Sequence, residues 1–517
     1  MKIISYNTGH DGHVCYVNND ELIFSHEMEK NNHPRYSKNS LKHLASCFTA
    51  PSTGFDIVAV SGWAVGNDPR NAPTDGGYLG LEYSVDDTRG ISWVHCSHEL
   101  SHIICTYALS PFADREDCYV LLWEGFIGRF YHISTDLKVE LLEDICESPG
   151  LRYSFAFAIA DPSFNLPRGY CRLGDAGKMM ALAAYGRSTE NSAEENALLD
   201  YLLNTSSPTD TFNKSDLCYS PLYNIGVDTQ EFCDFAKKVS DGIYAHFFES
   251  IERLATAKKP LLIAGGCGLN CDWNRRWEDC KLFSDVFIPP CTNDTGVAIG
   301  AAALAKKIFV GTSELRWTVY SGPEFNDSCS SELSPAYQQH PLSLELICDK
   351  LFDGELICWV QGRCEIGPRA LGNRSILGEP FNRCTTDKIN KVKNREHYRP
   401  VAPICLEEDA PLHFEQCTQS KFMLSFHRVK NPKLRAITHI DGTARVQTLT
   451  RSDNAATYDL LRQFKKISGV GVLCNTSLNF NGAGFINNIH DLELFCLQKK
   501  IGTFVVNNTM YCKQGDF

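Results

Sequence analysis

The sequence predicts an α/β protein with two domains, and three observations support this prediction. The chain has 517 residues, and single hydrophobic cores stop growing near about 250 to 300 residues. Short apolar runs separated by turns open the chain, and a long amphipathic pattern later leads directly into another apolar run. A second series of such runs follows a polar stretch near the middle of the chain, so each half is expected to build its own core.

The first expected elements form an antiparallel meander. Strand-like runs occur at 3–6, 13–17 and 21–24, separated by turn-forming residues. A similar strand-turn-strand pattern recurs at 118–133, which suggests an internally duplicated plan.

A long amphipathic helix is expected over residues 231–257, where apolar residues recur three or four apart. Pro260 then leads into the strand-like run 261–264, which ends in the glycine-rich turn Gly265-Gly-Cys-Gly268. Backbone N–H groups in such a turn can approach a phosphate or a nucleotide.

The expected linker covers residues 321–343, which are rich in Ser, Pro and Gln and lack sustained periodicity. The predicted domains are residues 1–330 and residues 344–517. The second is again α/β and begins near Leu344.

Composition excludes several classes of protein. Hydrophobic residues make up 43% and charged residues 22% of the chain, which is typical of a globular enzyme. No signal peptide and no transmembrane run is predicted. The 23 cysteines lack the paired spacing of a disulfide framework, so we expect a cytoplasmic protein. The net charge of −12 argues against a nucleic-acid partner.

Two histidines suggest a metal site. His98 and His102 stand four residues apart, so on a helix they share one face and can chelate one divalent metal ion. Glu124, after an apolar strand, and Asp294, before a helix of small residues, are the candidate carboxylate ligands. The alternative is that the histidines are surface or capping residues and the acids cap helices.

A second cluster concentrates cations in an otherwise acidic chain, within residues 361–375, 391–400 and 441–447. Arginine binds two phosphate oxygens through its planar fork, and lysine supplies a compact charge for a leaving pyrophosphate. The alternative is a solvated charged face, but the glycines and proline within the first segment specify a backbone shape and favour a binding site. We therefore expect a phosphorylated small substrate.

These residues resemble the NodU/CmcH carbamoyltransferase family over nearly the whole chain. The resemblance is carried by Gly367-Pro-Arg-Ala-Leu-Gly-Asn-Arg-Ser375, Arg399-Pro-Val-Ala-Pro403 and Asn475-Thr-Ser-Leu-Asn479. Three further motifs are similar to the 3-hydroxymethylcephem O-carbamoyltransferase branch: His10-Asp-Gly12, Trp123-Glu-Gly125, and Asp175-Ala-Gly-Lys178 through Gly186.

The resemblance implies an N-terminal actin-like (ASKHA) domain, similar to tRNA threonylcarbamoyl-transferases, and a C-terminal YrdC-like domain. It also implies two reaction steps. The C-terminal domain would join carbamoyl phosphate and ATP into carbamoyl adenylate and pyrophosphate. The N-terminal domain would then pass the carbamoyl group to a hydroxyl of a small-molecule natural product, such as an antibiotic or related metabolite, with a hydroxymethylcephem among the candidates.

The family's site residues fall on definite positions of this chain. Carbamoyl phosphate and ATP would be held by Arg369, Lys393, Arg399 and Arg445, with Arg374 and Arg395 as further candidates and Asn475, Thr476 and Ser477 lining the pocket. Lys393 is also a catalytic candidate. In the N-terminal domain the nucleotide would contact Lys178, Gly265, Gly266, Gly268 and Asn270.

The metal set would be His98, His102, Glu124 and Asp294, with His10 near the transferred carbonyl. Asp175 is either the base for the acceptor hydroxyl or a helix cap. Glu124 departs from the family, since many relatives have Asp there, and its longer side chain bears on metal preference. Iron(II) is our first choice, with magnesium and manganese as alternatives.

Three other functions fit parts of the sequence: a tRNA threonylcarbamoyl-transferase-like enzyme, an actin-like small-molecule kinase, and a non-enzymatic sensor of carbamoyl phosphate or nucleotide. The acidic balance disfavours the first, and the arginine-rich C-terminal half is not explained by the second. The sequence does not identify the acceptor alcohol. A homodimer is one candidate for the oligomeric state.

Overall fold

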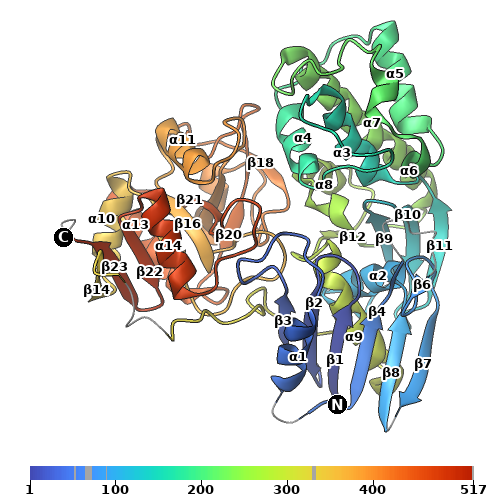
Figure 1. Cartoon of the computed structure of the whole chain (residues 1–517), viewed down its shortest axis with the longest axis horizontal. Helices are drawn as coiled ribbons and strands as arrows, with labels where there is room; N and C mark the ends of the chain where they lie inside the picture. Colours follow the sequence, from blue (N-terminus) through green and yellow to red (C-terminus); the bar gives the residue numbers. More distant parts are fainter. Residues whose placement is uncertain (52–53, 65–72, 89, 329–333, 515–517) are drawn as a thin grey trace. The chain divides into compact units, whose positions relative to one another are not determined.

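The computed structural model describes residues 1–51, 54–64, 73–88, 90–328 and 334–514, so part of the expected linker, 329–333, lies outside the described residues. Contacts divide the chain into two compact units (Figure 1). Unit 1 contains Met1–Val58 and Leu315–Phe517, and unit 2 contains Ala59–Glu314. This grouping differs from the expected division into 1–330 and 344–517, because the first strands belong with the C-terminal part of the chain.

Unit 1 opens with the expected antiparallel meander, in the order β3-β2-β1. Ile3 of β1 pairs with Val17 of β2, and the side chains of both are fully buried. Ser40 then caps a helix by accepting a hydrogen bond from the backbone N–H of His43. The bounds are β1 (Lys2–Asn7), β2 (His13–Asn18), β3 (Glu21–Glu27), α1 (Leu41–Thr49) and β4 (Ile57–Ser61), which carries the chain toward unit 2.

The C-terminal part of unit 1 is an eight-stranded mixed sheet in the order β14-β23-β22-β15-β16-β21-β17-β20. Side chains alternate across it. Ile357 and Trp359 pack into a core that includes residues of α10 and α13, whereas Cys358 and Val360 face a core that includes residues of α14. This period of two places one hydrophobic layer on each face of the sheet.

These strands are β14 (Tyr337–Pro341), β15 (Ile357–Val360), β16 (Arg374–Gly378), β17 (Ala402–Leu406), β20 (Gln447–Leu449), β21 (Val472–Ser477), β22 (Thr503–Val506) and β23 (Thr509–Lys513). A small hairpin pairs β18 (Phe426–Arg428) with β19 (Thr443–Arg445). The helices are α10 (Leu344–Phe352), α11 (Arg383–Val392), η5 (Glu407–Asp409), α12 (Ala410–His413), α13 (Ala455–Ser468) and α14 (Ile489–Lys499).

Unit 2 is built on a five-stranded sheet in the order β11-β10-β9-β12-β13. The strand pair predicted over 118–133 is present as β9 (Cys118–Trp123) and β10 (Gly128–Ile133), and β11 (Val139–Asp144) extends it. β12 (Leu261–Ala264) runs parallel to β9. The long helix expected over 231–257 is α7 (Gln230–Leu254), capped by Thr229.

The other elements of unit 2 are short strands and surrounding helices. The strands are β5 (Trp63–Ala64), β6 (Pro73–Thr74), β7 (Tyr83–Thr88), β8 (Ile91–Cys96) and β13 (Val286–Phe287). The helices are α2 (His98–Ala108), α3 (Pro149–Ala160), α4 (Asp175–Ala183), α5 (Ala193–Asn204), α6 (Pro208–Thr211), η1 (Lys214–Leu217), η2 (Gly266–Leu269), α8 (Cys271–Asp279), η3 (Asp294–Gly296) and α9 (Val297–Val310).

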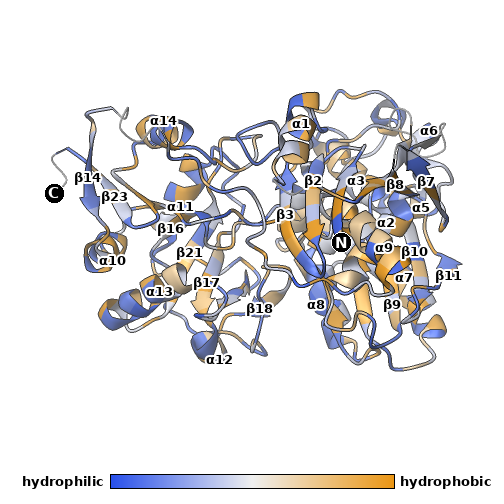
Figure 2. Cartoon of the chain, turned by 90° about the horizontal axis from the view of Figure 1, so that it is seen from below, coloured by the Kyte–Doolittle hydropathy of each residue, from blue (hydrophilic) through white to orange (hydrophobic). Residues whose placement is uncertain are grey.

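Helices α2 and α9 of unit 2 pack against each other at close range. A Cβ atom at Gly300 of α9 would collide with the carbonyl oxygen of Ser101 in α2, so only glycine permits this approach. Figure 2 shows hydrophobic residues along β2, β3, β9 and β17. The α/β class and the second, C-terminal α/β part are thus confirmed. None of the described helices is both long and apolar enough to cross a membrane.

A buried ion pair ties the N-terminal meander to the rest of unit 1. Glu27 Oε1 accepts a hydrogen bond of 2.7 Å from the Gly367 N–H, and Lys30 Nζ donates one of 2.6 Å to the Gly367 carbonyl. Lys30 Nζ lies 3.3 Å from Glu27 Oε2, and each side chain is 1% exposed. Burial raises the pKa of Glu27 to about 7 even though Lys30 lowers it. Both polar groups of Gly367 are therefore held by one charged pair.

We predict that Lys30→Met destabilises the protein by about 3 kcal/mol at pH 8, because breaking a buried pair leaves an uncompensated charge. The loss should be smaller at pH 6. Glu27 has a raised pKa in the folded state, so its ionisation opposes folding as pH rises from its unfolded pKa through about 7. Urea midpoints relative to wild type at both pH values measure this.

Arg451→Gln is the control, since it removes an exposed ion pair with Asp459 and should leave the midpoint unchanged. Equal destabilisation by Lys30→Met at pH 6 and pH 8 would contradict the proposed charge balance.

Candidate active sites

The first candidate site lies at the N-terminal end of α2 in unit 2. Ser97 caps this helix by accepting a hydrogen bond from the Leu100 N–H, which starts the helix at His98. His98 and His102 then lie one turn apart on the same face, with their Nε2 atoms 3.1 Å apart. The predicted pairing of the two imidazoles is therefore present in the structure.

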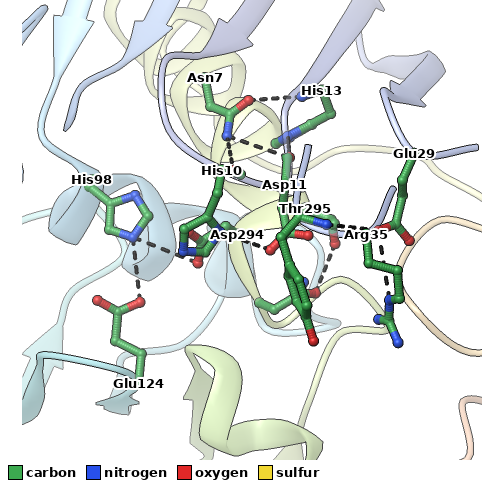
Figure 3. Close-up of polar contacts among 12 residues, drawn as sticks. Asn7, His10, Asp11, His13, Glu29, Arg35, His98, Glu124, Asp294 and Thr295 are labelled. Carbon is green, nitrogen blue, oxygen red and sulfur yellow. Dashed lines mark hydrogen bonds and ion pairs between the residues drawn. The ribbon is translucent and has the colours of Figure 1, made fainter. Parts of the chain in front are cut away.

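Two carboxylates complete this cluster. Glu124 Oε2 lies 3.4 Å from His98 Nε2 and 3.1 Å from His102 Nε2. Asp294 Oδ1 lies 3.8 Å and 3.4 Å from the same two nitrogens. Figure 3 shows His98 facing both acids. All four residues are buried, and their ligand atoms lie within 4.8 Å of one another. We call these residues the acid–imidazole cluster.

Aromatic residues enclose the acid–imidazole cluster. The Tyr78 hydroxyl donates a 2.5 Å hydrogen bond to Glu124 Oε1, and its ring stacks on His98 with centroids 4.5 Å apart. The Trp63 ring meets His98 edge to face at 4.8 Å. Tyr78 thus occupies the Glu124 oxygen that does not face the histidines. It orients the carboxylate as hydrogen-bonding partners of metal ligands do.

The electrostatics of the cluster fit a cation. Burial opposes the charge on Glu124, but the charge of His98 and hydrogen bonds from both histidines hold the pKa of Glu124 well below its usual value. Burial alone would lower the pKa of His102, yet hydrogen bonds to Asp294 and Glu124 raise it to about 9. With a pKa of about 9, His102 is protonated at neutral pH and offsets part of the carboxylate charge. A divalent cation would take over that role with the imidazoles neutral.

We predict that Tyr78→Phe weakens divalent-metal binding about 10-fold, since second-sphere hydrogen bonds to a metal ligand are typically worth that much. Titration of metal-free protein with iron(II), followed by absorbance or calorimetry, measures the affinity.

Tyr201→Phe is the matched control. It removes a hydroxyl in the same unit that donates to the Thr211 carbonyl and should leave metal affinity unchanged. Equal affinities for the two variants would show that the Tyr78 hydroxyl does not support the ligand set.

The second candidate site follows α11 in unit 1. It consists of Lys393, Arg395, Arg399 and Arg445, which we call the cation cluster. Lys393 is buried, and its Nζ donates to the carbonyls of Ser477 at 2.6 Å and Asn479 at 3.0 Å and to the side-chain oxygen of Asn479. These bonds fix the ammonium group without neutralising it.

No described carboxylate forms an ion pair with any of the four cations of this cluster. Burial, together with Arg399 and Arg445, lowers the pKa of Arg395 to about 9. Burial, with the charges of Arg395 and Arg35, holds the pKa of Lys393 well below its usual value. Arg445 Nε is buried and has no hydrogen-bond partner among the residues described. Such a cluster favours binding an anion.

Two family models match most of the chain. A model described as "Carbamoyltransferase N-terminus" matches residues 87–303, and one described as "Carbamoyltransferase C-terminus" matches residues 348–513. The chain is 40% identical to a 3'-hydroxymethylcephem-O-carbamoyltransferase of Amycolatopsis lactamdurans, with 99% of each chain covered. The chain belongs to the carbamoyltransferase family.

Further similarities of this carbamoyltransferase extend over its length. It is 39% identical to a 3'-hydroxymethylcephem-O-carbamoyltransferase of Streptomyces clavuligerus, with 99% of each covered. It is 31% identical to nodulation protein U of Rhizobium tropici, covering 99% of this chain and 96% of the relative. Among solved structures, an archaeal actin homologue covers 59% of this chain and 100% of its own, at 9% identity and a TM-score of 0.28.

His10 of the carbamoyltransferase lies in a tight loop of unit 1 between β1 and β2. Asn7 holds the loop from both ends: its Nδ2 donates to the His10 carbonyl at 2.9 Å, and its Oδ1 accepts from the His13 N–H at 2.8 Å. His10 Nδ1 lies 3.0 Å from Asp11 Oδ2, and 32% of the His10 side chain is exposed. His10 is a predicted site residue, whereas Asn7 was not predicted; its place at the start of the turn was the available signal.

Arg374 was predicted as a further anion ligand, but its guanidinium is hydrogen-bonded to other parts of the protein. It is fully buried, and its guanidinium donates to the carbonyls of Gln361 and Gly362 at 2.8 and 2.9 Å and to Asn487 Oδ1 at 2.6 Å. Its nitrogens therefore join the loop that precedes β16 to Asn487, which lies before α14. The fold therefore uses this guanidinium, and we leave Arg374 out of the anion site.

The predicted pocket residues on β21 support their neighbours. Asn475 Nδ2 donates to the Ala370 carbonyl at 3.1 Å, one residue beyond the half-buried Arg369. Ser477 Oγ donates to Asn479 Oδ1 at 2.6 Å, beside the Lys393 ammonium. Thr476, between them on the strand, is buried. Asn479, within the family motif, was not predicted as a site residue.

Asp175 is the first residue of α4, and Gly174 is the cap residue, so the capping role suggested for Asp175 is wrong. Its Oδ2 accepts a 2.7 Å hydrogen bond from Arg172 Nε, and Lys178 Nζ lies 3.1 Å from its Oδ1. The carboxylate is thus buried between two cations, one of which is a predicted nucleotide contact. The role of Asp175 as a base stays a prediction.

The glycine-rich turn after β12 is shaped by packing. Cβ atoms at Gly265 and Gly268 would collide with the Trp123 carbonyl and with Thr292 respectively, whereas Gly266 faces open space. Asn270 caps α8 by accepting from the Asp272 N–H at 3.1 Å. Gly265 thus lets the turn pass close to the end of β9 and to Glu124, and Gly268 lets it pack on Thr292. The nucleotide contacts predicted for Gly265, Gly266, Gly268 and Asn270 stay predictions.

Proposed function

We propose that this carbamoyltransferase forms carbamoyl adenylate at the cation cluster and transfers its carbamoyl group to a small-molecule hydroxyl at the acid–imidazole cluster. The cation cluster is the observation that carries the proposal. Four positive side chains without a described carboxylate partner match the charge of carbamoyl phosphate and ATP. Full-length similarity to O-carbamoyltransferases supports the same reaction.

In the first step, carbamoyl phosphate is hydrolysed to carbamate before ATP reacts. Water attacks the phosphorus of carbamoyl phosphate, and carbamate and inorganic phosphate are released. A carbamate oxygen then attacks the α-phosphorus of ATP, a new P–O bond forms, and pyrophosphate leaves with the electron pair of the broken P–O bond. The products are carbamoyl adenylate, pyrophosphate and phosphate. Arg399 and Arg445 hold the phosphate oxygens, and Lys393 stabilises the charge that grows on the leaving pyrophosphate.

In the second step the acceptor hydroxyl attacks the carbamoyl carbon, its proton passes to a base, and AMP leaves. A divalent cation, iron(II) by first choice and magnesium or manganese otherwise, would be held by His98, His102, Glu124 and Asp294 and would polarise the carbamoyl carbonyl. His10, on the loop held by Asn7, is the residue we propose to act near that carbonyl. Asp175 is the candidate base, with Arg172 and Lys178 holding its carboxylate in place.

The acceptor is proposed to be a hydroxymethylcephem or a related hydroxylated metabolite. Two relatives named for that acceptor are 40% and 39% identical to this chain over 99% of its length. The relative named nodulation protein U is less similar to this chain, at 31% identity, and it supports the hydroxymethylcephem acceptor less directly. We place the reaction in the cytoplasm, because both co-substrates are cytoplasmic metabolites and the 23 cysteines suit a reducing compartment.

We predict that Lys393→Ala lowers carbamoyl adenylate formation at least about 100-fold and leaves transfer from supplied carbamoyl adenylate intact, because Lys393 stabilises only the first step. His102→Ala should abolish transfer from supplied carbamoyl adenylate and leave carbamoyl adenylate formation intact. It should also lose bound metal. Pyrophosphate release, carbamoylated acceptor and metal content are the three readouts.

Lys388→Ala is the control for the first variant, since Lys388 is an exposed lysine of α11, the helix that ends just before Lys393. It should leave both steps unchanged. Loss of both activities in Lys393→Ala with an unchanged melting temperature would argue against two separate sites.

A further inference from the structure

The N-terminal segment 27–36 docks beside the cation cluster in unit 1. Pro34 forms an antiparallel bridge with Ala483, the Arg35 N–H donates to the Gly482 carbonyl at 3.0 Å, and the Gly484 N–H donates to the His33 carbonyl at 2.9 Å. Together with the buried Glu27–Lys30 pair at Gly367, these bonds fix the backbone of the segment at two places.

The docking partner of this segment also anchors Lys393. Asn479 Nδ2 donates to the Ala483 carbonyl at 2.8 Å, and the side-chain oxygen of Asn479 accepts from the Lys393 ammonium. Ala483, which pairs with Pro34 beside Arg35, is therefore joined by one hydrogen bond to Asn479. Asn479 in turn accepts from Lys393. In agreement with this proximity, the charge of Arg35 contributes to the lowered pKa values of Lys393 and Arg399, after the larger effect of burial.

The Arg35 guanidinium keeps its charge among nearby acidic groups. Burial opposes that charge, but Tyr36, Glu29, Asp11 and Glu27 raise the pKa of Arg35 above its usual value. Its ion pair with Glu29 Oε2 is long, at 3.8 Å, and the Arg35 side chain is 39% exposed. Glu29 Oε2 also accepts from the Tyr36 N–H at 3.4 Å. Figure 3 shows Arg35 beside Glu29. The guanidinium lies 5.3 Å from the centre of the Tyr36 ring, so stacking holds it without neutralising it.

We propose that Arg35 is a further phosphate-binding residue of the cation cluster, supplied by the N-terminal segment to the carbamoyl phosphate and ATP site. The ligand chemistry is a terminal phosphate, either that of carbamoyl phosphate or the leaving pyrophosphate of ATP. The Tyr36 ring, which meets His10 edge to face at 6.3 Å, links this end of the site to the His10 loop. The inference rests on the proposed function of the cation cluster.

The test measures pyrophosphate release by the full-length enzyme while carbamoyl phosphate and ATP are varied separately. Arg35→Gln should raise the KM for one of the two about 10-fold with a smaller change in kcat, because a charge-assisted contact to phosphate is lost. The substrate whose KM rises identifies the phosphate. Arg35→Lys should recover part of the loss, since it restores the charge without the planar fork.

Two further variants separate the possible failures. Arg383→Gln, at the exposed start of α11, should leave both KM values unchanged. Arg399→Gln, within the cation cluster, should raise them. If Arg399→Gln weakens binding and Arg35→Gln behaves like Arg383→Gln, or lowers only kcat, the role of Arg35 is overturned while the site stands. If Arg399→Gln also has no effect, the proposed anion site itself fails.

Direct binding of pyrophosphate by calorimetry gives an independent readout. Wild type and Arg35→Lys should bind it more tightly than Arg35→Gln, with melting temperatures within a degree or two of one another. Equal pyrophosphate affinity for Arg35→Gln and wild type, together with unchanged KM values, would overturn the proposal.

Discussion

The structure depends on one electrostatic constraint: a charge withdrawn from water must be balanced by another charge or by hydrogen bonds. Most buried charges of this protein meet that constraint within the fold, as Glu27 and Lys30 do through each other and Gly367. In two clusters the buried charges are only partly balanced. The acid–imidazole cluster gathers two buried carboxylates around two imidazoles. The cation cluster gathers positive side chains with no acid paired to them among the described residues. Their opposite excess charges suit a metal ion at one and phosphates at the other.

The surrounding fold keeps each cluster from relaxing. In unit 2, the close contact of α2 with α9 at Gly300 sets the helix that carries both histidines against the helix that follows Asp294. In unit 1, the Arg374 guanidinium donates to the carbonyls of Gln361 and Gly362 and to Asn487 Oδ1, so it holds the segment before β16 in place. Within the motif 367–375, Arg374 thus serves the fold, and the proposed anion site uses other arginines.

The sequence predicted most of what depends on local spacing. The four-residue separation of His98 and His102 determines a shared helix face, and the turn positions of Glu124 and Asp294 made them natural ligands. Contacts between distant segments were not predictable. Nothing in the spacing shows that Arg374 is satisfied by carbonyls, that Gly174 rather than Asp175 caps α4, or that segment 27–36 pairs with residues near 483. The same long-range pairing explains why the compact units differ from the domains expected from the linker composition.

The most direct measurement of the central claim is a quenched reaction without acceptor. Metal-loaded protein is incubated with ATP and carbamoyl phosphate, and the products are identified by mass spectrometry. The account predicts carbamoyl adenylate together with equal amounts of pyrophosphate and inorganic phosphate, accumulating to no more than a few turnovers until an alcohol is added. Formation of ADP, or no pyrophosphate from folded and metal-loaded protein, would contradict it.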